Sequence, residues 1–361
     1  MPANSSGRPG PSSRLSRREI LEAARRFYDL GHTKGDIAKD MGISGSYLAR
    51  VLQRARDNGW IKIFIEDDRE TELAAALRQR YPNLVHVEVV PSGSTPEDTA
   101  RSIAMATATW FDDLLDRDEE SGNPQIRNVA IGGSMVHGQF VQRIASRKNG
   151  ISVGPTALTP TSAKVARFTA PMLAQQLAFR LGAISPGDAM PPPAERTGFL
   201  YSPSRLVPPA GPIEAIAQWW ADVVTDADYL EMLQFWERLD IAFVSMVGTQ
   251  WVYDDVRRKL ESLGIRLEHL VKKGATALLA NQFIRDDGSA VPLVPGVPSY
   301  EPAIPVETLR RLSHRATATD PRSGFVVLDA WGERSGLRPA WLETSLCNVL
   351  CCDDVVGTSL R

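Results

Sequence analysis

Apolar residues recur at the three-to-four-residue spacing of a helix three times within the first sixty residues of the chain. The first predicted helix covers about 16–30, where Ile20, Ala24 and Phe27 fall on one face. Gly31 follows as a C-terminal cap, because glycine adopts the left-handed conformation with which many helices end. The pattern predicts three short helices, each with one apolar face turned toward a shared core.

The second and third helices are separated by a glycine. Thr33 starts the second helix, with Asp36 three residues later as its partner in a capping box. Ser44 caps the third helix, whose apolar residues recur at i, i+3, i+4 and i+7; these are Leu48, Val51, Leu52 and Ala55. An Asn-Gly pair then stops the helix, and residues 60–65 alternate as a half-buried strand does. The order predicts a winged helix-turn-helix domain.

The charge of the chain is split between this segment and the rest. The 361 residues carry a formal net charge of −2, yet residues 1–65 hold 12 Lys/Arg and 6 Asp/Glu, which leaves −8 for the remainder. A basic head on an acidic body is typical of a DNA-reading module joined to a larger domain. Chance clustering gives the same totals, so charge alone does not decide the question.

In a helix-turn-helix, the second helix of the pair lies in the major groove, with its N-terminal residues at base edges. Arginine and glutamine read purine edges and serine reads either base. Arg50 and Arg54 suit phosphate contacts equally well, and such contacts position the protein without reading sequence. The candidate DNA-binding residues are Thr33, Ser44, Ser46, Tyr47, Arg50, Gln53, Arg54 and, on the wing strand, Lys62. The alternative is a plain helical hairpin with a solvated basic face.

The rest of the chain alternates between strand-like and helix-length segments. The predicted strands are 84–90, 126–131, 151–156, 240–247, 324–329 and 346–351. The predicted helices are 69–81, 96–116, 137–147, 170–181, 213–222, 227–238, 251–263 and 305–313. Strands separated by helices predict an α/β domain with a doubly wound, mostly parallel sheet. The expected organisation is a disordered tail 1–14, a helix-turn-helix domain 15–66, a linker helix 67–82 and an α/β effector domain 83–361 with a proline-rich insertion at 186–212.

Two short polar loops in this domain follow predicted strands. Gly132, Gly133 and Ser134 lie between a strand and a helix, where backbone N–H groups and the helix dipole can hold an anion. A tight turn without a ligand has the same sequence, and both interpretations stay open. Gly248, Thr249 and Gln250 also follow a strand and are expected to line the same pocket. His137, just after the first loop, is expected to be exposed at the start of its helix.

The remaining candidate chemistry is sparse. Cys347, Cys351 and Cys352 have no histidine nearby, and neighbouring cysteines on a strand face opposite ways, so we predict a structural role and no metal site. Trp219 and Trp220 are expected to form core or a subunit contact. The N-terminus is polar and no run of about 18 apolar residues exists. We expect a cytoplasmic protein with no membrane span and no cofactor.

The segment DIAKDMGIS…YLARVLQRARDNGWIKI resembles the N-terminus of the SorC family of sugar-binding bacterial transcriptional regulators. Further similarity runs along nearly the whole chain, at 69–81, Val89–Pro91, Val129–Ser134, Phe283–Pro292, Ile304–Leu312 and 346–354. The resemblance implies an effector domain with the fold of sugar-phosphate isomerases and CoA transferases. It also implies a phosphorylated sugar or related polyol as inducer, and a tetramer on DNA.

The chain departs from the family pattern at three places. The loop GGSMVHG lacks the family's aromatic-Gly-Arg-Thr run, and Ala277-Leu278 replaces a usual Gly-Asp. The late Gly-Glu-Glu-Lys is Gly-Glu-Arg-Ser here, which makes Arg334 or Arg338 the replacement for the lysine as phosphate partner. An arginine fork is not equivalent to an ammonium group. The departures indicate an unusual effector or a pocket that has lost its ligand.

The sequence therefore predicts a transcriptional regulator whose α/β domain senses a sugar phosphate, sugar or polyol and controls operator binding. Its expected partners are double-stranded operator DNA, the small-molecule effector and further copies of the chain. One alternative is a constitutive regulator with a degenerate pocket. Another is an enzyme related to sugar-phosphate isomerases, which is disfavoured because no acid–base pair stands near the loops; no catalytic residue is predicted.

Overall fold

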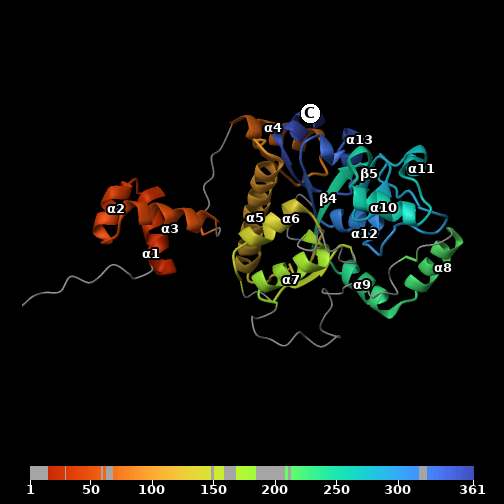
Figure 1. Ribbon diagram of the computed structural model, residues 1–361, viewed down its shortest axis with the longest axis horizontal. Helices are drawn as coiled ribbons and strands as arrows, with labels where there is room; N and C mark the ends of the chain where they lie inside the picture. The colour runs from red at the N-terminus through yellow and green to blue at the C-terminus, as the bar shows by residue number, and fades with distance from the viewer. Residues whose placement is uncertain are drawn as a thin grey trace, which may run out of the picture. The chain divides into compact units, whose positions relative to one another are not determined.

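The computed structural model describes residues 15–28, 30–57, 60–61, 68–147, 150–157, 168–183, 208–209, 213–316 and 323–361. Internal contacts divide the chain into two compact units, Met1–Ile65 and Glu66–Arg361 (Figure 1). Three predicted features lie outside the described residues: the tail 1–14, the wing strand from Lys62 onward, and the proline-rich insertion 186–212 except for residues 208–209.

The first unit contains the three predicted helices, α1 Arg17–Tyr28, α2 Lys34–Asp40 and α3 Gly45–Asp57. Its core brings Ile37 of α2 against Leu48 and Leu52 of α3, all of them buried. Gly31 adopts a φ of +70°, as expected for the residue that follows a helix end. The local signals of the sequence, apolar spacing and capping residues, are therefore sufficient to place these helices.

The second unit is built on a parallel sheet whose strand order is β1-β8-β7-β4-β2-β3. Its strands are β1 His86–Val90, β2 Asn128–Ile131, β3 Ser152–Pro155, β4 Ile241–Gly248, β7 Phe325–Ala330 and β8 Val349–Asp353. All six predicted strands are present, and the predicted α/β class with a mostly parallel sheet is confirmed. Two three-residue strands, β5 Ala277–Leu279 and β6 Gln282–Ile284, extend β4 as an antiparallel hairpin.

Helices cover both faces of this sheet (Figure 1). The face that carries Phe325 and Val327 packs on α5 Pro96–Glu120, α6 Met135–Arg143 and α7 Ala170–Arg180. The face that carries Val326 and Leu328 packs on the other helices. These are α4 Asp68–Arg80, α8 Ile213–Val223, α9 Ala227–Glu237, α10 Asp254–Ser262, α11 Leu267–Lys272, α12 Val306–Ser313, α13 Pro339–Leu342 and α14 Asp354–Leu360.

Strand order sets where a ligand can bind. From β2 the chain winds outward to β3, whereas β4, β7 and β8 wind in the opposite direction. The direction reverses between β2 and β4, which are neighbours. In open α/β sheets, ligands bind outside the carboxyl ends of the strands at such a switch point. The two predicted loops follow β2 and β4, the two strands on either side of this point.

Candidate DNA-reading face and candidate effector site

The third helix presents the predicted residues on its outer side. Leu48, Leu52 and Ala55 are at most 1% exposed and form the inner stripe, as predicted. Six predicted residues are exposed and Tyr47 is half-buried; the exposed six are Thr33, Ser44, Ser46, Arg50, Gln53 and Arg54. The arrangement leaves one polar face of α3 accessible to a groove.

Two of these residues have a structural task that the sequence also predicts. The Thr33 hydroxyl accepts a 3.2 Å hydrogen bond from the Asp36 N–H and so caps α2, and it donates a 2.6 Å bond to the Asp36 carboxylate. The Asp36 carboxylate thus bonds the Thr33 hydroxyl, whereas the predicted capping box has it bond the Thr33 backbone N–H. The Ser44 hydroxyl accepts a 3.1 Å bond from the Tyr47 N–H at the start of α3. Gln53 accepts a hydrogen bond from the guanidinium of Arg56. Caps therefore account for Thr33 and Ser44 without any contact to DNA.

At the end of β2, hydrogen bonds to β4 and α6 hold the backbone of the glycine loop. The Gly132 N–H donates to the Phe243 carbonyl at 2.9 Å, and the Gly132 carbonyl lies 2.8 Å from Nδ1 of His137. The Ser134 hydroxyl accepts a 3.0 Å bond from the His137 N–H and so caps α6. Ser134 is thus an N-cap, and α6 turns its N-terminal dipole and first N–H groups toward the loop.

Close packing explains why two glycines stand here. A Cβ on Gly133 would lie 2.6 Å from the Phe168 carbonyl oxygen, and one on Gly132 would lie 3.2 Å from the Thr156 hydroxyl. Thr156 follows β3, is 1% exposed, and its hydroxyl has no hydrogen-bond partner among the described residues. The loop therefore combines a helix N-terminus with a buried, unpartnered hydroxyl.

The prediction that His137 is exposed is wrong. Its side chain is fully buried, because α6 turns it inward between the helix and the sheet. Its Nε2 lies 3.0 Å from Oδ2 of Asp329 on β7, and Oδ1 of Asp329 accepts a 3.0 Å bond from Thr107 on α5. The sequence contained a signal for this pair, since Asp329 is a lone acid in the apolar strand FVVLDA.

The second predicted loop lies with the segment that follows β7. Gly248 leads into the 3₁₀ turn η4 Thr249–Trp251, and a Cβ on Gly336 would lie 2.4 Å from the Gly248 Cα. A second turn, η5 Glu333–Ser335, carries Arg334, whose guanidinium lies 5.3 Å from the centre of the Trp251 ring. Trp251 is 40% exposed, so the two side chains form an accessible cation–π pair.

Strand register separates the two loops. Ile131 pairs with Phe243, so Gly132 is level with Val244. Gly248 lies four residues further along β4, about 13 Å at the usual rise of a strand. The structure therefore does not bring Gly132 and Gly248 side by side. It does bring Gly248, Thr249 and Gln250 to the turn that carries Arg334.

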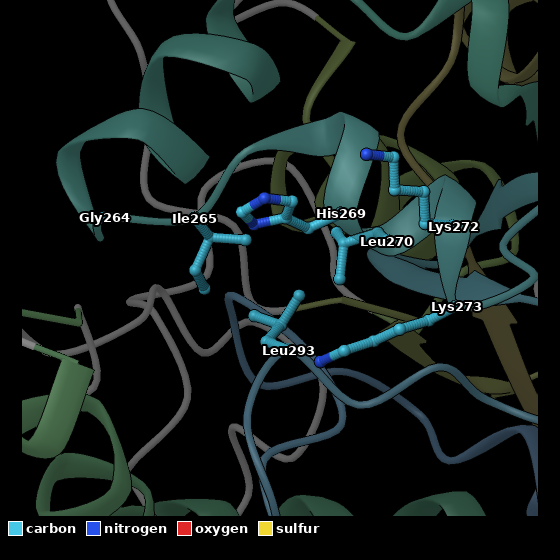
Figure 2. Close-up of a pocket in the computed structure, with 7 residues that line it drawn as sticks. All are labelled: Gly264, Ile265, His269, Leu270, Lys272, Lys273 and Leu293. Carbon is cyan, nitrogen blue, oxygen red and sulfur yellow. The ribbon is translucent and has the colours of Figure 1, made fainter.

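A cavity of about 330 Å³ lies elsewhere, beside α11 (Figure 2). It is lined by Gly264, Ile265, His269, Leu270, Lys272, Lys273 and Leu293. Figure 2 shows the side chain of Lys273 extending toward Leu293, while that of Lys272 extends away from it. None of the predicted effector residues lines this cavity.

The cysteines are buried thiols. Cys351 and Cys352 pack into opposite faces of the sheet, as predicted. Burial raises the pKa of the Cys347 thiol to about 12 and also raises the pKa values of the other two. The described part of the chain contains no group of three or more His, Cys, Asp or Glu side chains placed to hold a metal ion. Trp219 and Trp220 are buried in the core, and no described helix is long and apolar enough to span a membrane.

Comparison with known proteins rests on structure. No protein-family model and no curated protein matches the sequence. The full-length sorbitol operon regulator SorC from Klebsiella pneumoniae superposes with a TM-score of 0.65 at 17% identity, over 96% of this chain and 99% of that one. The chain has the SorC fold. The match extends over nearly all of both chains, which agrees with the resemblance seen in the sequence.

Two further structures are similar to this chain over most of its length. A transcriptional regulator from Streptococcus pneumoniae TIGR4 matches with a TM-score of 0.60 at 16% identity, over 81% of this chain and 97% of that one. A DeoR family transcriptional regulator from Listeria monocytogenes matches with a TM-score of 0.56 at 14% identity, over 81% and 99%. At these identities the comparisons establish the fold, and residue roles have to be argued from this chain alone.

Proposed function

We propose that the protein is a DNA-binding transcriptional regulator of the SorC family whose second unit binds a sugar phosphate, sugar or polyol and thereby controls operator binding. The observation that carries the proposal is the conjunction of a capped, outward-facing third helix with a second unit of SorC fold in one chain. The neighbour that covers 96% of the chain is described as a sorbitol operon regulator. On this proposal the protein is a cytoplasmic homo-oligomer, a tetramer by family resemblance.

The proposal assigns base and phosphate contacts to the exposed side of α3. Ser46, Arg50 and Gln53 are spaced three to four residues apart and so follow one another along one face of the helix. Arg54 adds a cation at the edge of that face, where phosphates lie in major-groove complexes. Thr33, Ser44 and Tyr47 flank it, and Lys62 stays a prediction because it lies outside the described residues.

For the effector we propose two contact regions at the carboxyl ends of the strands. The start of α6, with the N–H groups of Gly133 and Ser134 and the buried Thr156 hydroxyl, suits an anion such as a phosphate. Gly248, Thr249, Gln250 and Arg334 suit the other end of an extended ligand, because β4 places them about 13 Å further along.

An enzymatic role has less support. Among the described residues, the one acid–imidazole pair near the loops, His137 with Asp329, is fully buried. Nδ1 of its imidazole faces the Gly132 carbonyl, so neither ring nitrogen is presented to a substrate. General acid–base catalysis needs a titrating group within hydrogen-bond reach of the reacting atom. We therefore assign no catalytic residue.

The test begins with selection of binding sites from a random DNA pool with the full chain. Enrichment of one sequence is expected, and Arg50→Ala should weaken binding to it by about 1–3 kcal/mol if Arg50 reads a base. The matched control is Arg258→Ala, an exposed arginine on α10 in the second unit, which removes the same charge. A pool without any enriched sequence would contradict the regulator proposal.

A thermal-shift screen of sugar phosphates, sugars and polyols tests the effector. A ligand at one hundred times its Kd stabilises the native state by about 2.7 kcal/mol, so binding raises the melting temperature of the second unit. If DNA selection succeeds and no compound in the screen binds, the constitutive regulator replaces the effector-controlled one. Gly133, which packs closely on the Phe168 carbonyl, is the feature that would favour that outcome.

A further inference from the structure

A buried imidazole–carboxylate pair lies beneath the glycine loop. His137 stands in the first turn of α6 and Asp329 next to the end of β7, and both side chains have no solvent exposure. His137 Nδ1 is 2.8 Å from the Gly132 carbonyl oxygen, and its Nε2 is 3.0 Å from Asp329 Oδ2. The pair therefore connects the loop after β2 to strand β7, across the point where the strand order reverses.

Hydrogen-bond accounting fixes the protons of this pair. A carbonyl oxygen only accepts, so Nδ1 of His137 must carry a proton toward Gly132. A neutral ring would then turn a bare Nε2 lone pair toward the Asp329 carboxylate at 3.0 Å. Two such groups repel at short range in a buried site, where screening is weak. A proton on Nε2 removes this repulsion and makes the contact, which is not aligned as a hydrogen bond, a close ion pair.

Thr107, Phe243 and Cys351 lie around the pair. Thr107 donates to the other carboxylate oxygen of Asp329, and the Phe243 ring lies 6.5 Å from the His137 ring. Cys351 on β8 is in register with Asp329, and burial together with that carboxylate raises the pKa of its thiol, so Cys351 adds no charge. Burying a charge pair costs desolvation that a well-packed apolar pair would avoid. Such a cost suggests a positional task.

We propose that His137 and Asp329 are a positioning pair that locks the Gly132 peptide and so sets the direction of the N–H groups at the start of α6. The Phe243 carbonyl holds the Gly132 N–H, which belongs to the preceding peptide, and His137 holds the Gly132 carbonyl, which shares the next peptide with the Gly133 N–H. The pair therefore fixes the direction of the Gly133 N–H. β7 continues into the turn that carries Arg334, which places both effector regions on elements that the pair connects. The effector part of this inference rests on the proposed function.

The shared proton is tested first, and this test needs no ligand. In the full chain labelled with ¹⁵N-histidine, we expect a slowly exchanging downfield proton on Nε2 of one ring, assigned by its loss in His137→Asn. In Asp329→Asn the amide can donate to a neutral Nε2, so the ring loses that proton while the shape of the site is kept. A wild-type protein without the signal, or an Asp329→Asn protein that retains it, would overturn the ion pair.

Stability measurements test the same pair by rescue. His137→Asn leaves the Asp329 carboxylate buried without its cation, and the melting temperature should fall. Adding Asp329→Asn to that variant should recover at least half of the loss, because the unpaired charge disappears. The matched control adds Asp118→Asn to the His137→Asn variant. Asp118 is a buried carboxylate that accepts N–H bonds from Gln125 and Ile126, so this substitution should lower the melting temperature below that of His137→Asn alone. A double variant no more stable than His137→Asn would contradict the pairing.

The amide signals of the glycine loop test the positioning role. In Asp329→Asn we expect the amide signals of Gly133, Ser134 and Met135 to shift without ligand, and inorganic phosphate to bind at least tenfold more weakly than to the wild type. Unchanged loop signals would overturn the positioning role. If phosphate binds neither protein, the anion contact of the proposed function fails, while the ligand-free shifts still decide whether the pair positions the loop.

Discussion

The two units of this chain differ in how far apart in sequence their defining contacts lie. In the first unit the contacts that start its second and third helices are short-range: Thr33 caps one helix through Asp36, and Ser44 caps the next through Tyr47. In the second unit the candidate site depends on contacts such as Thr107 with Asp329, which are 222 residues apart. The comparison shows that local sequence determines the candidate DNA-reading face, whereas sheet register determines the candidate effector site.

The largest expected effect tests whether the first unit depends on its own small core. Leu48 is fully buried, and Leu48→Ala should cost about 2–5 kcal/mol of unfolding free energy. A unit of this size has little stability to lose, so we expect it to unfold near ambient temperature and DNA binding to disappear. Calorimetry of the full chain should show the unfolding transition of the second unit unchanged.

A matched substitution in the other unit sharpens this comparison. Leu177 on α7 is also fully buried, and Leu177→Ala should lower only the transition of the second unit while leaving DNA affinity intact. If either substitution shifts both transitions together, the two units fold cooperatively and their separation by contacts does not describe their stability.

Short-range signals explain why so much of the first unit is predictable. Helix spacing, two N-caps and the glycine at position 31 each act within a few residues, and the structure has each of them where the sequence predicts it. The same holds for the six main strands and most helices of the second unit. The candidate DNA-binding residues follow from the inner stripe of Leu48 and Leu52, because the opposite side of a helix must be outside.

The candidate effector site is predictable only in part. The sequence places Gly132 and Gly248 after strands of one sheet, but the four-residue offset that separates them depends on pairing between β2 and β4. The inward turn of His137 depends on its distant partner Asp329. The sequence does not predict the β5–β6 hairpin either, because three-residue strands that are buried throughout show no alternation.

An intermediate effect is expected where two loops of the second unit touch. Gly336 has a φ of +63°, and a Cβ there would lie 2.4 Å from the Gly248 Cα. Gly336→Ala should cost about 2–5 kcal/mol, the sum of left-handed strain and overpacking against backbone. Chemical denaturation of the second unit gives this cost directly.

The control for this substitution separates strain from contact. Gly264 has a φ of +70° with no neighbour within 4 Å of the added Cβ, so Gly264→Ala should cost only the strain, about 1–2 kcal/mol. Equal costs at the two positions would mean that the loops after β4 and β7 are not held together as described. A larger cost at Gly336 supports a preformed second effector region.

The smallest effect on stability is expected at Arg334, and it is the most informative about function. The exposed pair with Trp251 is worth about 0.5–1 kcal/mol, so Arg334→Ala should leave the melting temperature almost unchanged. If this guanidinium contacts the effector, the same variant should lose most of the stabilisation that an effector gives to the wild-type protein. The control is Arg258→Ala, which removes the same charge from an exposed position on α10. If both variants keep the effector stabilisation equally, the site is confined to the loop at Gly132. The residues of β4 that extend beyond β2 would then contribute to packing alone.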